Sequence, residues 1–446
     1  MFDYNILELS YPSNLCHNYG KFSQLSGFVL IESADQLRGR FDILTAFPYD
    51  LVNEKHLSDL SNLFIYLDSL LPPVYSNCDL PFQGGAIGYF SYDLACQLAG
   101  IEMKTHPDME GMPLFHLGLY DWAIIVDHHL KKVSLFTANT RKETSEIAAA
   151  MAELWVEAGK EAATNGDYKI QLPLSSFISY DDYQNSFGFI QEALFQGRCY
   201  QANLTQCFSL NYEGNSYAIY QAIRALNPVP YGAFIKLENA DILSFSPECF
   251  LTYKQGKLRT SPIKGTARND ENEANDDAVK LALINSEKNR AENIMIVDLL
   301  RNDLGKIAKK GSVRVTELCE LQSYKGVHHL VSHIEAECRE DIGMFEAFGA
   351  CFPGGSITGA PKLESMKVIA ESEAFGRGVY CGSIGYFSRH GRFDTNIAIR
   401  TITAKGNKLL FAAGGGIVID SECDKEYDEC FIKINPILKG LLENGK

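Results

Sequence analysis

Hydrophobic residues recur with two different spacings along the first 176 residues. Short apolar runs and apolar/polar alternation predict strands at residues 27–33, 40–45, 83–90, 117–126 and 132–137. Apolar residues at helical spacing predict helices over residues 56–71 and 141–163. A polar stretch follows the second helix and continues to Ser176, so we place a boundary there, between a region 1–176 and a region 177–446.

The region after Ser176 alternates helical and strand patterns. Strands are predicted at residues 198–208, 235–237, 242–245, 250–253, 256–260, 382–388, 394–403 and 409–416, and helices at residues 180–195, 275–302 and 421–442. In the strand 198–208, Gln201, Asn203 and Thr205 share one face because side chains alternate along a strand. A polar face on a central strand indicates a hydrated pocket.

Composition narrows the class of protein. The chain has 446 residues, 46% of them hydrophobic, and a formal net charge of -15. Scattered basic residues on an acidic chain argue against binding to nucleic acid. Its 12 cysteines form no C-x-x-C pair, and we find neither a signal segment nor an apolar run of the roughly 18 residues that a membrane-spanning helix requires. We therefore expect a cytoplasmic protein with reduced thiols and no membrane contact.

One lysine stands in an unusual local sequence. Lys264 follows a predicted strand and lies between Pro262, which fixes φ, and Gly265, which permits a tight turn. A lysine held in this way can serve as a positioned amine. The alternative is a surface turn whose lysine extends into water, as most lysines do.

Carboxylates share a face of the final predicted helix. Glu426, Glu429 and Lys433 are spaced i, i+3 and i+7, and the glycines at 414–416 precede them, where bare backbone can approach a ligand. Two carboxylates of this kind suit Mg²⁺, which keeps several waters. A solvated charged face is the alternative, and the same holds for Glu292 on the helix 275–302.

Other polar residues have both a structural and a functional interpretation. Arg400, in the predicted strand 394–403, is suited to a bidentate carboxylate grip or to a structural ion pair. Glu248 ends a strand and is either a surface acid or a carboxylic acid of raised pKa. His328 and His329 are adjacent in a strand-like stretch, so only one of them can face a pocket.

The glycine-rich stretch 353–362 is not a nucleotide-binding loop. Ala360 follows Gly359 where a Walker A loop has Gly-Lys-Ser/Thr, which excludes an NTPase of that class. The stretch is either a tight turn or a set of amide donors for a carboxylate at the start of a helix. Cys351 narrowly misses a nucleophile elbow, and we find no acyl-transfer triad.

Eight motifs in consistent order resemble the chorismate-utilising enzymes. They are YQANL at 200–204, SPE at 246–248, PIKGT at 262–266, RAEN at 290–293, DLLRND at 298–303, VHHL at 327–330, FPGGSITGAPK at 352–362 and GGGIV at 414–418. The N-terminal third is similar to the family only in outline, through IES at 31–33 and RFD at 40–42. The resemblance implies an α+β fold with two large packed antiparallel sheets, helices outside, and interwoven N- and C-terminal portions.

The resemblance also implies roles for individual residues. Chorismate would be held on Mg²⁺ between Glu292 and Glu429, with Glu426 acting through water. Glu248 would protonate the departing C4 hydroxyl, and His329 would assist this proton transfer. The residues implied to contact the substrate are Gln201, Thr266, Thr358, Tyr386, Arg400, Gly415, Gly416 and Lys433.

Two positions separate the branches of the family. Anthranilate synthases carry alanine where this chain has Lys264, whereas a lysine there resembles the branch in which it attacks chorismate C2. The isochorismate and salicylate branch has a lysine in place of Gln201 to activate water. The resemblance therefore implies Mg²⁺-dependent amination of chorismate with ammonia to 4-amino-4-deoxychorismate, a step toward 4-aminobenzoate and folate. An anthranilate synthase large subunit and a catalytically silent chorismate-binding subunit are the alternatives.

The resemblance implies further partners. The chain has no glutaminase elbow, so ammonia would come from a separate glutamine amidotransferase subunit. Some family members bind tryptophan in the N-terminal region. Glu32 and Ser33, together with residues 227–231, are similar to that pocket.

Overall fold

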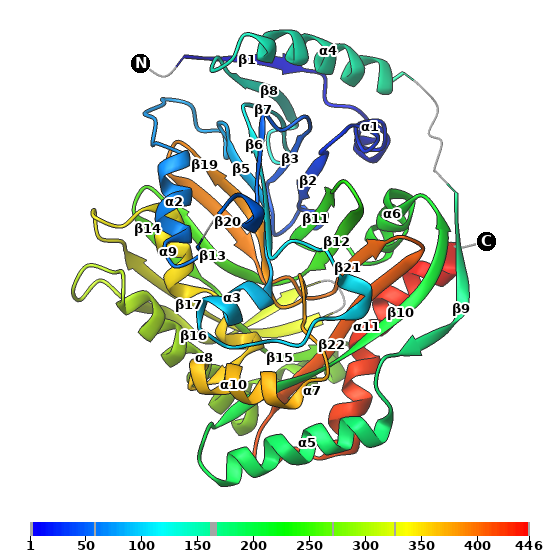
Figure 1. The fold of residues 1–446 in the computed structure, drawn as a ribbon, viewed down its shortest axis with the longest axis vertical. Helices are drawn as coiled ribbons and strands as arrows, with labels where there is room; N and C mark the ends of the chain where they lie inside the picture. Colours follow the sequence, from blue (N-terminus) through cyan, green and yellow to red (C-terminus); the bar gives the residue numbers. More distant parts are fainter. Residues whose placement is uncertain (1–2, 58, 161–166, 270–271, 325–326, 445–446) are drawn as a thin grey trace.

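A computed structural model describes residues 3–57, 59–160, 167–269, 272–324 and 327–444, and their strands form two antiparallel sheets (Figure 1). The 12-stranded sheet has the order β1 (Tyr4–Leu9), β8 (Lys132–Ala138), β7 (Trp122–Asp127), β3 (Phe41–Thr45), β2 (Val29–Glu32), β11 (Tyr231–Lys236), β12 (Ala240–Ser246), β21 (Thr401–Lys405), β22 (Lys408–Ile417), β10 (Gln201–Gly214) and β18 (Gly359–Ala360), with β9 (Tyr168–Ser176) paired to β10. The 10-stranded sheet has the order β15 (Ile263–Arg268), β17 (Val327–Glu337), β14 (Lys257–Thr260), β13 (Cys249–Lys254), β20 (Arg392–Asn396), β19 (Ser383–Ser388), β5 (Gly85–Phe90), β6 (Phe115–Tyr120) and β4 (Asp50–Val52), with β16 (Arg314–Tyr324) paired to β17. The predicted α+β class with two large antiparallel sheets is confirmed.

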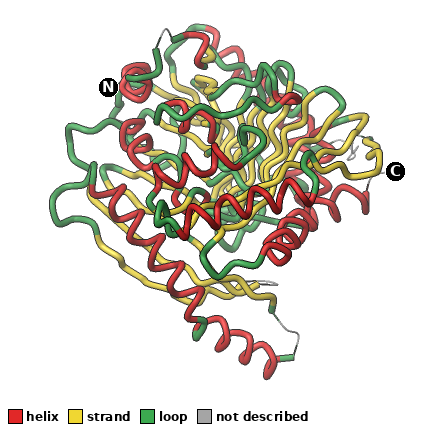
Figure 2. The backbone as a smooth tube through the Cα atoms, turned by 60° about the horizontal axis from the view of Figure 1, so that its bottom comes forward, coloured by secondary structure: helices red, strands yellow, loops and turns green. Residues whose placement is uncertain are grey.

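Helices surround the strands, as Figure 2 shows. They are α1 (Leu15–Phe22), α2 (Leu63–Leu70), α3 (Tyr92–Leu98), α4 (Glu143–Ala158), α5 (Tyr180–Phe195), α6 (Ser216–Leu226), α7 (Glu273–Ile284), α8 (Glu287–Gly305), α9 (Met344–Cys351), α10 (Lys362–Ser372) and α11 (Cys423–Asn444), with short 3-10 turns η1 (Glu54–His56), η2 (Pro107–Met109) and η3 (Gly355–Ile357). α5 and α10 pack on β10, α11 packs on α6 and β22, and α8 packs along β15 and β17 (Figure 1). Among the described helices, none is long and apolar enough to cross a bilayer.

Both sheets take strands from either side of Ser176. β2 pairs with β11 in the larger sheet, and β5 pairs with β19 in the smaller one. Ser176 itself ends β9, a strand of the larger sheet that pairs with β10. The beginning of the polar stretch, at residues 164–166, lies outside the described residues. The regions 1–176 and 177–446 therefore share their sheets.

Two chain segments cross side by side from one sheet to the other. β12 and β13 belong to different sheets, and Pro247 and Glu248 join them; residues 397–400 likewise join β20 to β21. The crossings are tied together, because the Ser246 hydroxyl donates to the Ile397 carbonyl (2.6 Å) and the Ile397 amide donates to the Glu248 carbonyl (3.1 Å). Strands that switch sheets in this way form corners between packed sheets.

The crossing at residues 397–400 corrects the predicted single strand 394–403. Arg400 lies in a bend with φ of 50°, outside both strands, where the chain changes sheet. The prediction that Arg400 lies in a strand is therefore wrong, and the alternation of side chains along a strand does not apply to it. Periodicity alone does not show a change of sheet when both flanking segments are extended.

Lys264 lies within a strand rather than in a turn. β15 pairs with β17, and the register shifts between Ile263 and Thr266. Gly265 has φ of 84°, which is the geometry of a bulge that a glycine permits. A β-carbon there would lie 3.2 Å from Asn289 on α8, so the glycine also lets the helix approach.

The long predicted helix 275–302 is two helices. α7 ends at Ile284, and Ser286 caps α8 by accepting a hydrogen bond from the Asn289 amide (3.3 Å). A serine that caps a helix start offers the backbone a partner outside the helical ladder. The break separates α8, which packs on β15 and β17, from α7, which also contacts β15.

Aromatic packing fixes the start of the glycine-rich loop. Phe348 on α9 lies 4.8 Å, ring to ring, from Phe90 of β5, and Phe345 lies 4.1 Å from Phe387 of β19. Aromatic pairs of this kind add to the free energy gained by burial. α9 is therefore held firmly against the 10-stranded sheet, and the loop from Phe352 onward starts from a fixed point.

Candidate active site

Glu248 is a buried carboxyl group at one of the two sheet crossings. Its side chain is 7% exposed, and the Ser356 hydroxyl of η3 donates a hydrogen bond to its Oε1 (2.9 Å). Burial raises the pKa of Glu248, and the Ser356 hydrogen bond and the Lys264 charge lower it by less. The group is thus suited to hold a proton and release it.

Lys264 reaches the same loop from the bulged strand β15. Its Nζ lies 3.5 Å from the carbonyl oxygen of Ser356, a long contact that leaves the amine largely free. Burial lowers the pKa of Lys264, outweighing Glu292 and Glu248, whose charges raise it. A lysine with a lowered pKa carries more of the neutral, nucleophilic amine. The surface-turn alternative therefore loses its support.

Thr266 and His329 form a pair across β15 and β17. They are register partners, and the Thr266 hydroxyl shares a hydrogen bond with His329 Nδ1 (2.8 Å). Burial, followed by the charges of Arg38 and Arg400, lowers the pKa of His329 to about 4. His329 is therefore neutral near pH 7. His328 faces the other way and contacts Ser323 and Asp276.

Arg400 lies near Arg38, which is itself paired with Asp35 (2.7 Å). Burial and the Arg38 charge lower the pKa of Arg400. Within the described part of the chain, no carboxylate forms an ion pair with Arg400, which argues against the structural ion pair. A guanidinium without such a partner suits an anionic ligand, and a carboxylate matches its geometry.

The acidic face of α11 meets the glycines of β22. The Ser421 hydroxyl donates to Glu426 Oε1 (2.7 Å), while Lys433 pairs with Glu429 (2.6 Å) and donates to the Gly414 carbonyl (2.7 Å). A β-carbon at Gly415 would lie 2.8 Å from Glu426 Oε2 and 3.5 Å from Glu429 Oε1. The glycine keeps backbone and carboxylates close together.

The carboxylates of Glu426 and Glu429 are oxygen donors of the kind that a divalent cation takes. Burial raises the pKa of Glu426, and the neighbouring Glu429 charge raises it further. Glu292, on α8, is close enough to Lys264 to be the leading charge that raises its pKa. Oxygen donors that repel one another are the kind of set that Mg²⁺ takes in proteins.

Gln201 is fully buried, next to Gly416 of β22 and linked to Ser356 through Asn203. Its Nε2 donates to Asn203 Oδ1 (3.2 Å), and Asn203 Nδ2 donates to the Ser356 carbonyl (3.4 Å). Among the described residues, nothing donates a hydrogen bond to Gln201 Oε1. A buried acceptor without a partner costs free energy unless a ligand or water supplies a donor.

Gly416 stands directly beside the Gln201 side chain. A β-carbon at Gly416 would lie 2.2 Å from Gln201 Nε2, so any other residue at this position of β22 would displace the Gln201 amide. Thr358 has a different part: its hydroxyl donates to the Gly354 carbonyl (3.0 Å) and its carbonyl accepts from the Asn203 amide (2.8 Å). Thr358 therefore shapes the loop.

Tyr386 lies apart from this group, which corrects its assignment to the substrate. It belongs to β19, contacts the Phe82 ring at 6.0 Å, and lines a separate cavity of about 350 Å³. Alternate residues of a strand face opposite sides, and Tyr386 faces the side shared with Ile384.

Tyr380, six residues before Tyr386, is buried near α11. Burial raises its pKa most, followed by Cys381, while Cys430 of α11 adds to the rise and Arg377 opposes it. Its only sequence signal was a tyrosine directly before Cys381 and Gly382. Ser356 was likewise not assigned a role, although it lies inside the glycine-rich motif.

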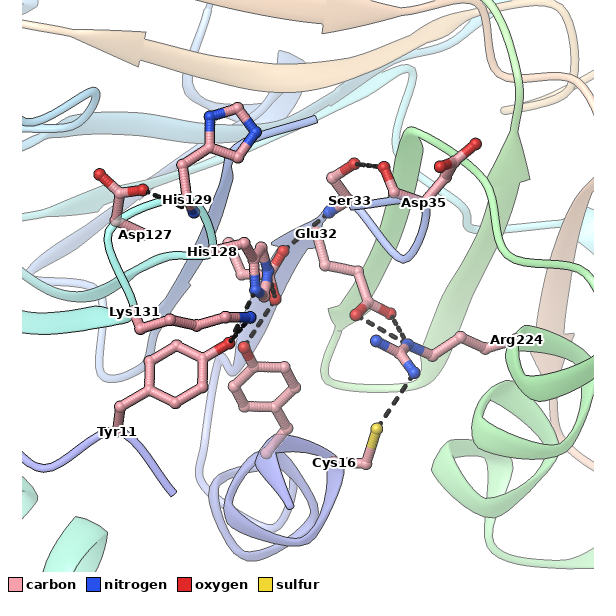
Figure 3. A network of polar contacts seen from close by, with 12 residues as sticks. Tyr11, Cys16, Glu32, Ser33, Asp35, Asp127, His128, His129, Lys131 and Arg224 are labelled. Atoms are coloured by element: carbon pink, nitrogen blue, oxygen red, sulfur yellow. Dashed lines mark hydrogen bonds and ion pairs between the residues drawn. The ribbon is translucent and has the colours of Figure 1, made fainter. Parts of the chain in front are cut away.

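The separate cavity is bounded by the N-terminal segment. Glu32 and Ser33 line it with Arg38, Tyr231 and Tyr386. Figure 3 shows Glu32 facing Arg224, whose Nε donates to both carboxylate oxygens (2.6 and 2.8 Å).

A buried carboxylate supports the same segment. The Ser33 amide donates to Asp42 (2.8 Å), and the His128 ring lies beside this carboxylate, with Nε2 2.8 Å from Oδ2. Tyr11 contacts Nδ1 of His128 (3.2 Å; Figure 3). The backbone that carries Glu32 and Ser33 is therefore fixed from both sides.

Comparison with known proteins places this fold and site in one family. The pattern of the chorismate binding enzymes matches residues 49–439, and the chain belongs to this family. It is 40% identical over 443 residues to aminodeoxychorismate synthase component 1 of Escherichia coli, covering 95% of both chains. It is 33% identical over 437 residues to anthranilate synthase component 1 of Aquifex aeolicus, covering 95% of this chain and 86% of that one. The predicted resemblance to the chorismate-utilising enzymes is confirmed.

Solved structures agree on the fold. Anthranilate synthase component I of Streptococcus pneumoniae superposes with a TM-score of 0.81 at 29% identity, covering 90% of this chain and 92% of that one. The menaquinone-specific isochorismate synthase of Escherichia coli has a TM-score of 0.76 at 16% identity, covering 99% and 95%. At that identity the second likeness concerns the fold alone.

Proposed function

We propose that this protein aminates chorismate at C4 with ammonia, giving 4-amino-4-deoxychorismate, in a Mg²⁺-dependent reaction. The observation that carries the proposal is the placement of Lys264 and Glu248 on either side of Ser356, an amine of lowered pKa facing a carboxyl group of raised pKa. The relatives named aminodeoxychorismate synthase component 1 support the choice of reaction. Lys264 argues against an anthranilate synthase.

The proposed chemistry has two displacements. In the first, the neutral amine of Lys264 forms a bond to C2, the ring double bonds shift, and the C4–O bond breaks. Glu248 gives the proton with which the hydroxyl leaves as water, and neutral His329 assists this transfer. In the second, ammonia forms a bond to C4, the double bonds shift back, and the bond between C2 and Lys264 breaks.

The substrate is a dicarboxylate in an acidic protein, so its charge must be met locally. Arg400, Lys433 and the backbone amides of Gly415 and Gly416 would receive the carboxylates. Glu292 and Glu429, with Glu426 through water, would hold Mg²⁺, which when bound neutralises charge between these glutamates and the anionic substrate. Thr266 would support the reaction by orienting His329.

Gln201 would meet the nitrogen nucleophile. Its buried carbonyl oxygen is an acceptor to which ammonia can donate, whereas a glutamine is a poor base for activating water. A role in holding ammonia fits both the orphaned acceptor and the absence of a lysine at this position.

Two further partners are proposed. Ammonia would be supplied by a separate glutamine amidotransferase subunit, in keeping with relatives named as a first component. The cavity lined by Glu32, Ser33 and Tyr231 has polar and aromatic walls that suit an amino acid such as tryptophan. Calorimetric titration with tryptophan checks the second proposal, and a Ser33→Trp variant that fills the cavity is its control.

The decisive experiment measures product identity. Purified protein is given chorismate, ammonium and Mg²⁺, with and without a 4-aminobenzoate-forming lyase. We expect Mg²⁺-dependent loss of chorismate and, with the lyase, 4-aminobenzoate. Fluorescent anthranilate formed without the lyase would instead identify an anthranilate synthase, and unchanged chorismate would identify a silent binding subunit. Glutamine consumption by this chain alone would contradict a separate glutaminase.

A further inference from the structure

Arg377 is a buried arginine in the segment that joins α10 to β19. Its side chain is 3% exposed and forms a bidentate pair with Glu373 (Nε to Oε2 2.9 Å, NH2 to Oε1 2.6 Å). Its guanidinium also lies over the Tyr92 ring, 4.5 Å from the centroid. A charge pair buried this deeply costs free energy unless all of its donors and acceptors form hydrogen bonds. The other hydrogen bonds of Arg377 are therefore part of what stabilises the pair.

Those remaining contacts go to two backbone carbonyls next to the site. Arg377 NH1 donates to Ile357 (2.9 Å), and NH2 donates to Asn203 (3.2 Å). Glu373 completes the connection, because its Oε1 accepts from both the amide (2.9 Å) and the hydroxyl (2.8 Å) of Thr205. One ion pair thus joins η3 to the part of β10 that carries Gln201.

The two carbonyls flank Ser356 from both directions. Ile357 follows it in the chain, and Asn203 contacts it through space, since Asn203 Nδ2 donates to the Ser356 carbonyl (3.4 Å). The Asn203 amide also donates to the Thr358 carbonyl (2.8 Å). Ser356 is the residue that contacts both Lys264 and Glu248. A shift of Arg377 would therefore move the residue between them.

The backbone of Arg377 is itself anchored in the N-terminal region. The Asp93 carboxylate of α3 accepts hydrogen bonds from the amides of Arg377 (2.9 Å) and Gly378 (3.0 Å). Lys104 donates to the Glu373 carbonyl (3.0 Å). The groups that hold Arg377, Asp93 and Glu373 among them, therefore lie outside the loop of η3 that its guanidinium contacts.

We propose that Arg377 is a positioning residue for the proposed reaction, which holds the carbonyls of Ile357 and Asn203 so that Ser356 stays between Lys264 and Glu248. The inference rests on the proposed roles of Lys264 and Glu248. Only a planar guanidinium can serve a carboxylate and two carbonyls in fixed directions at once; the single ammonium of a lysine keeps the charge and loses this fork.

The test uses Arg377→Lys in the full chain, with Arg198→Lys as the matched control. Arg198 also binds two glutamates, Glu364 and Glu371, but among the described residues its side chain forms no hydrogen bond with η3 or with β10. For each protein, kcat and KM for chorismate are measured between pH 5 and 9 with ammonium as the nitrogen source, and the thermal midpoint is recorded. Chorismate consumption is the readout.

We expect Arg377→Lys to remain folded and to lose about 100-fold in kcat, as a misplacement of about 1 Å typically costs, with KM changed by less than about threefold. kcat/KM should fall at high pH as Glu248 loses its proton. In Arg377→Lys this fall, the high-pH limb of the profile, should occur at higher pH, because Ser356 no longer stabilises the carboxylate and the pKa of Glu248 rises. Ser356→Ala should give the same displacement. Arg198→Lys should leave the limb in place.

Several results would overturn the proposal. One is a change in KM with kcat unaltered. Another is a pH profile of kcat/KM that does not shift, with kcat reduced only in proportion to the fraction of folded protein. If Arg377→Lys does not fold, the neutral pair Glu373→Gln with Arg377→Met carries the same measurement. Failure of both proteins to fold would assign Arg377 to the fold and reject the positioning role.

The same data separate this proposal from the proposed function. If the high-pH limb of kcat/KM lies at the same pH in Ser356→Ala as in the wild type, Glu248 is not the acid that this limb reports. If the limb moves in Ser356→Ala but not in Arg377→Lys, the role of Arg377 alone is rejected. A product other than 4-amino-4-deoxychorismate would reject the proposed reaction while leaving the comparison of limbs valid.

Discussion

The Ser356 hydroxyl donates a hydrogen bond to Glu248 across 2.9 Å, and this bond stabilises the charged form of the buried carboxyl group. Burial raises the pKa of Glu248, and this hydrogen bond works against burial. The balance sets the pH above which the acid no longer holds its proton. Ser356 therefore adjusts the pH range of the proposed reaction.

Replacing Ser356 with alanine tests this balance. Without the hydroxyl, the pKa of Glu248 should rise further, by about one unit if the bond is worth what bonds to charged groups usually are. A general acid works below its pKa, so the falling limb of kcat/KM should move to higher pH. Ser372→Ala is the control, since among the described residues this hydroxyl donates to the Ile369 carbonyl of its own helix α10. An equal shift in both variants would contradict the assignment.

Lys264→Met tests the nucleophile. Ammonium-dependent turnover should fall by about 10³-fold or more, while Lys257→Met, an exposed lysine on β14, should behave as wild type. The pKa of Lys264 is lowered, so the wild-type rate should rise with pH as that amine loses its proton. Intact-protein mass spectrometry after acid quenching should find chorismate minus water attached to the wild type. An adduct of the same mass on Lys264→Met would remove the basis for this role.

The carboxylates of α11 predict a change in Mg²⁺ affinity. Glu429→Gln and Glu426→Gln should each weaken Mg²⁺ binding by about tenfold or more, measured by calorimetry as well as by activation. Asp428→Asn, on the opposite face of the helix, removes the same charge and should not change the affinity. An equal loss of Mg²⁺ affinity in Asp428→Asn and Glu429→Gln would show that the cation is attracted by the overall negative charge of the helix and not by a defined site.

Gly265 and Gly256 form a matched pair for the bulge beside Lys264. Their φ values are 84° and 83°, so alanine at either position should lower the free energy of unfolding by about 1–2 kcal/mol. A methyl group at Gly256 meets open space, whereas at Gly265 it meets Asn289 at 3.2 Å and Leu283 at 3.3 Å. Urea denaturation should show a loss of stability in both. Only Gly265→Ala should lose activity, and retained activity there would show that the bulge does not position Lys264.

Recognition of the motifs predicted the family and the class of fold. Lys264 and Glu248, each in a short sequence typical of the family, both contact Ser356 in the structure, and the roles assigned to them stay predictions. The spacing of Glu426, Glu429 and Lys433 on one helical face was also predicted correctly. These successes depend on residues that are close in sequence.

The failures concern relationships that sequence distance hides. Tyr386 was assigned to the substrate although its strand turns it toward another cavity, and Tyr380 was overlooked because no local pattern distinguishes it. Arg377 contacts Asn203 across 174 positions of the chain. The bulge at Lys264 was taken for a turn because proline and glycine favour both, and only pairing with β17 decides between them.

The two sheet crossings have a consequence for how such a protein can change its chemistry. Glu248 and Arg400 extend from corner backbone that is tied into both sheets, so a new side chain nearby need not disturb either ladder. A synthase of isochorismate shares this frame at 16% identity. Side chains at the two crossings can therefore be exchanged with little effect on the pairing of either sheet, and a library that seeks altered chemistry at the proposed site should begin with the residues of these crossings.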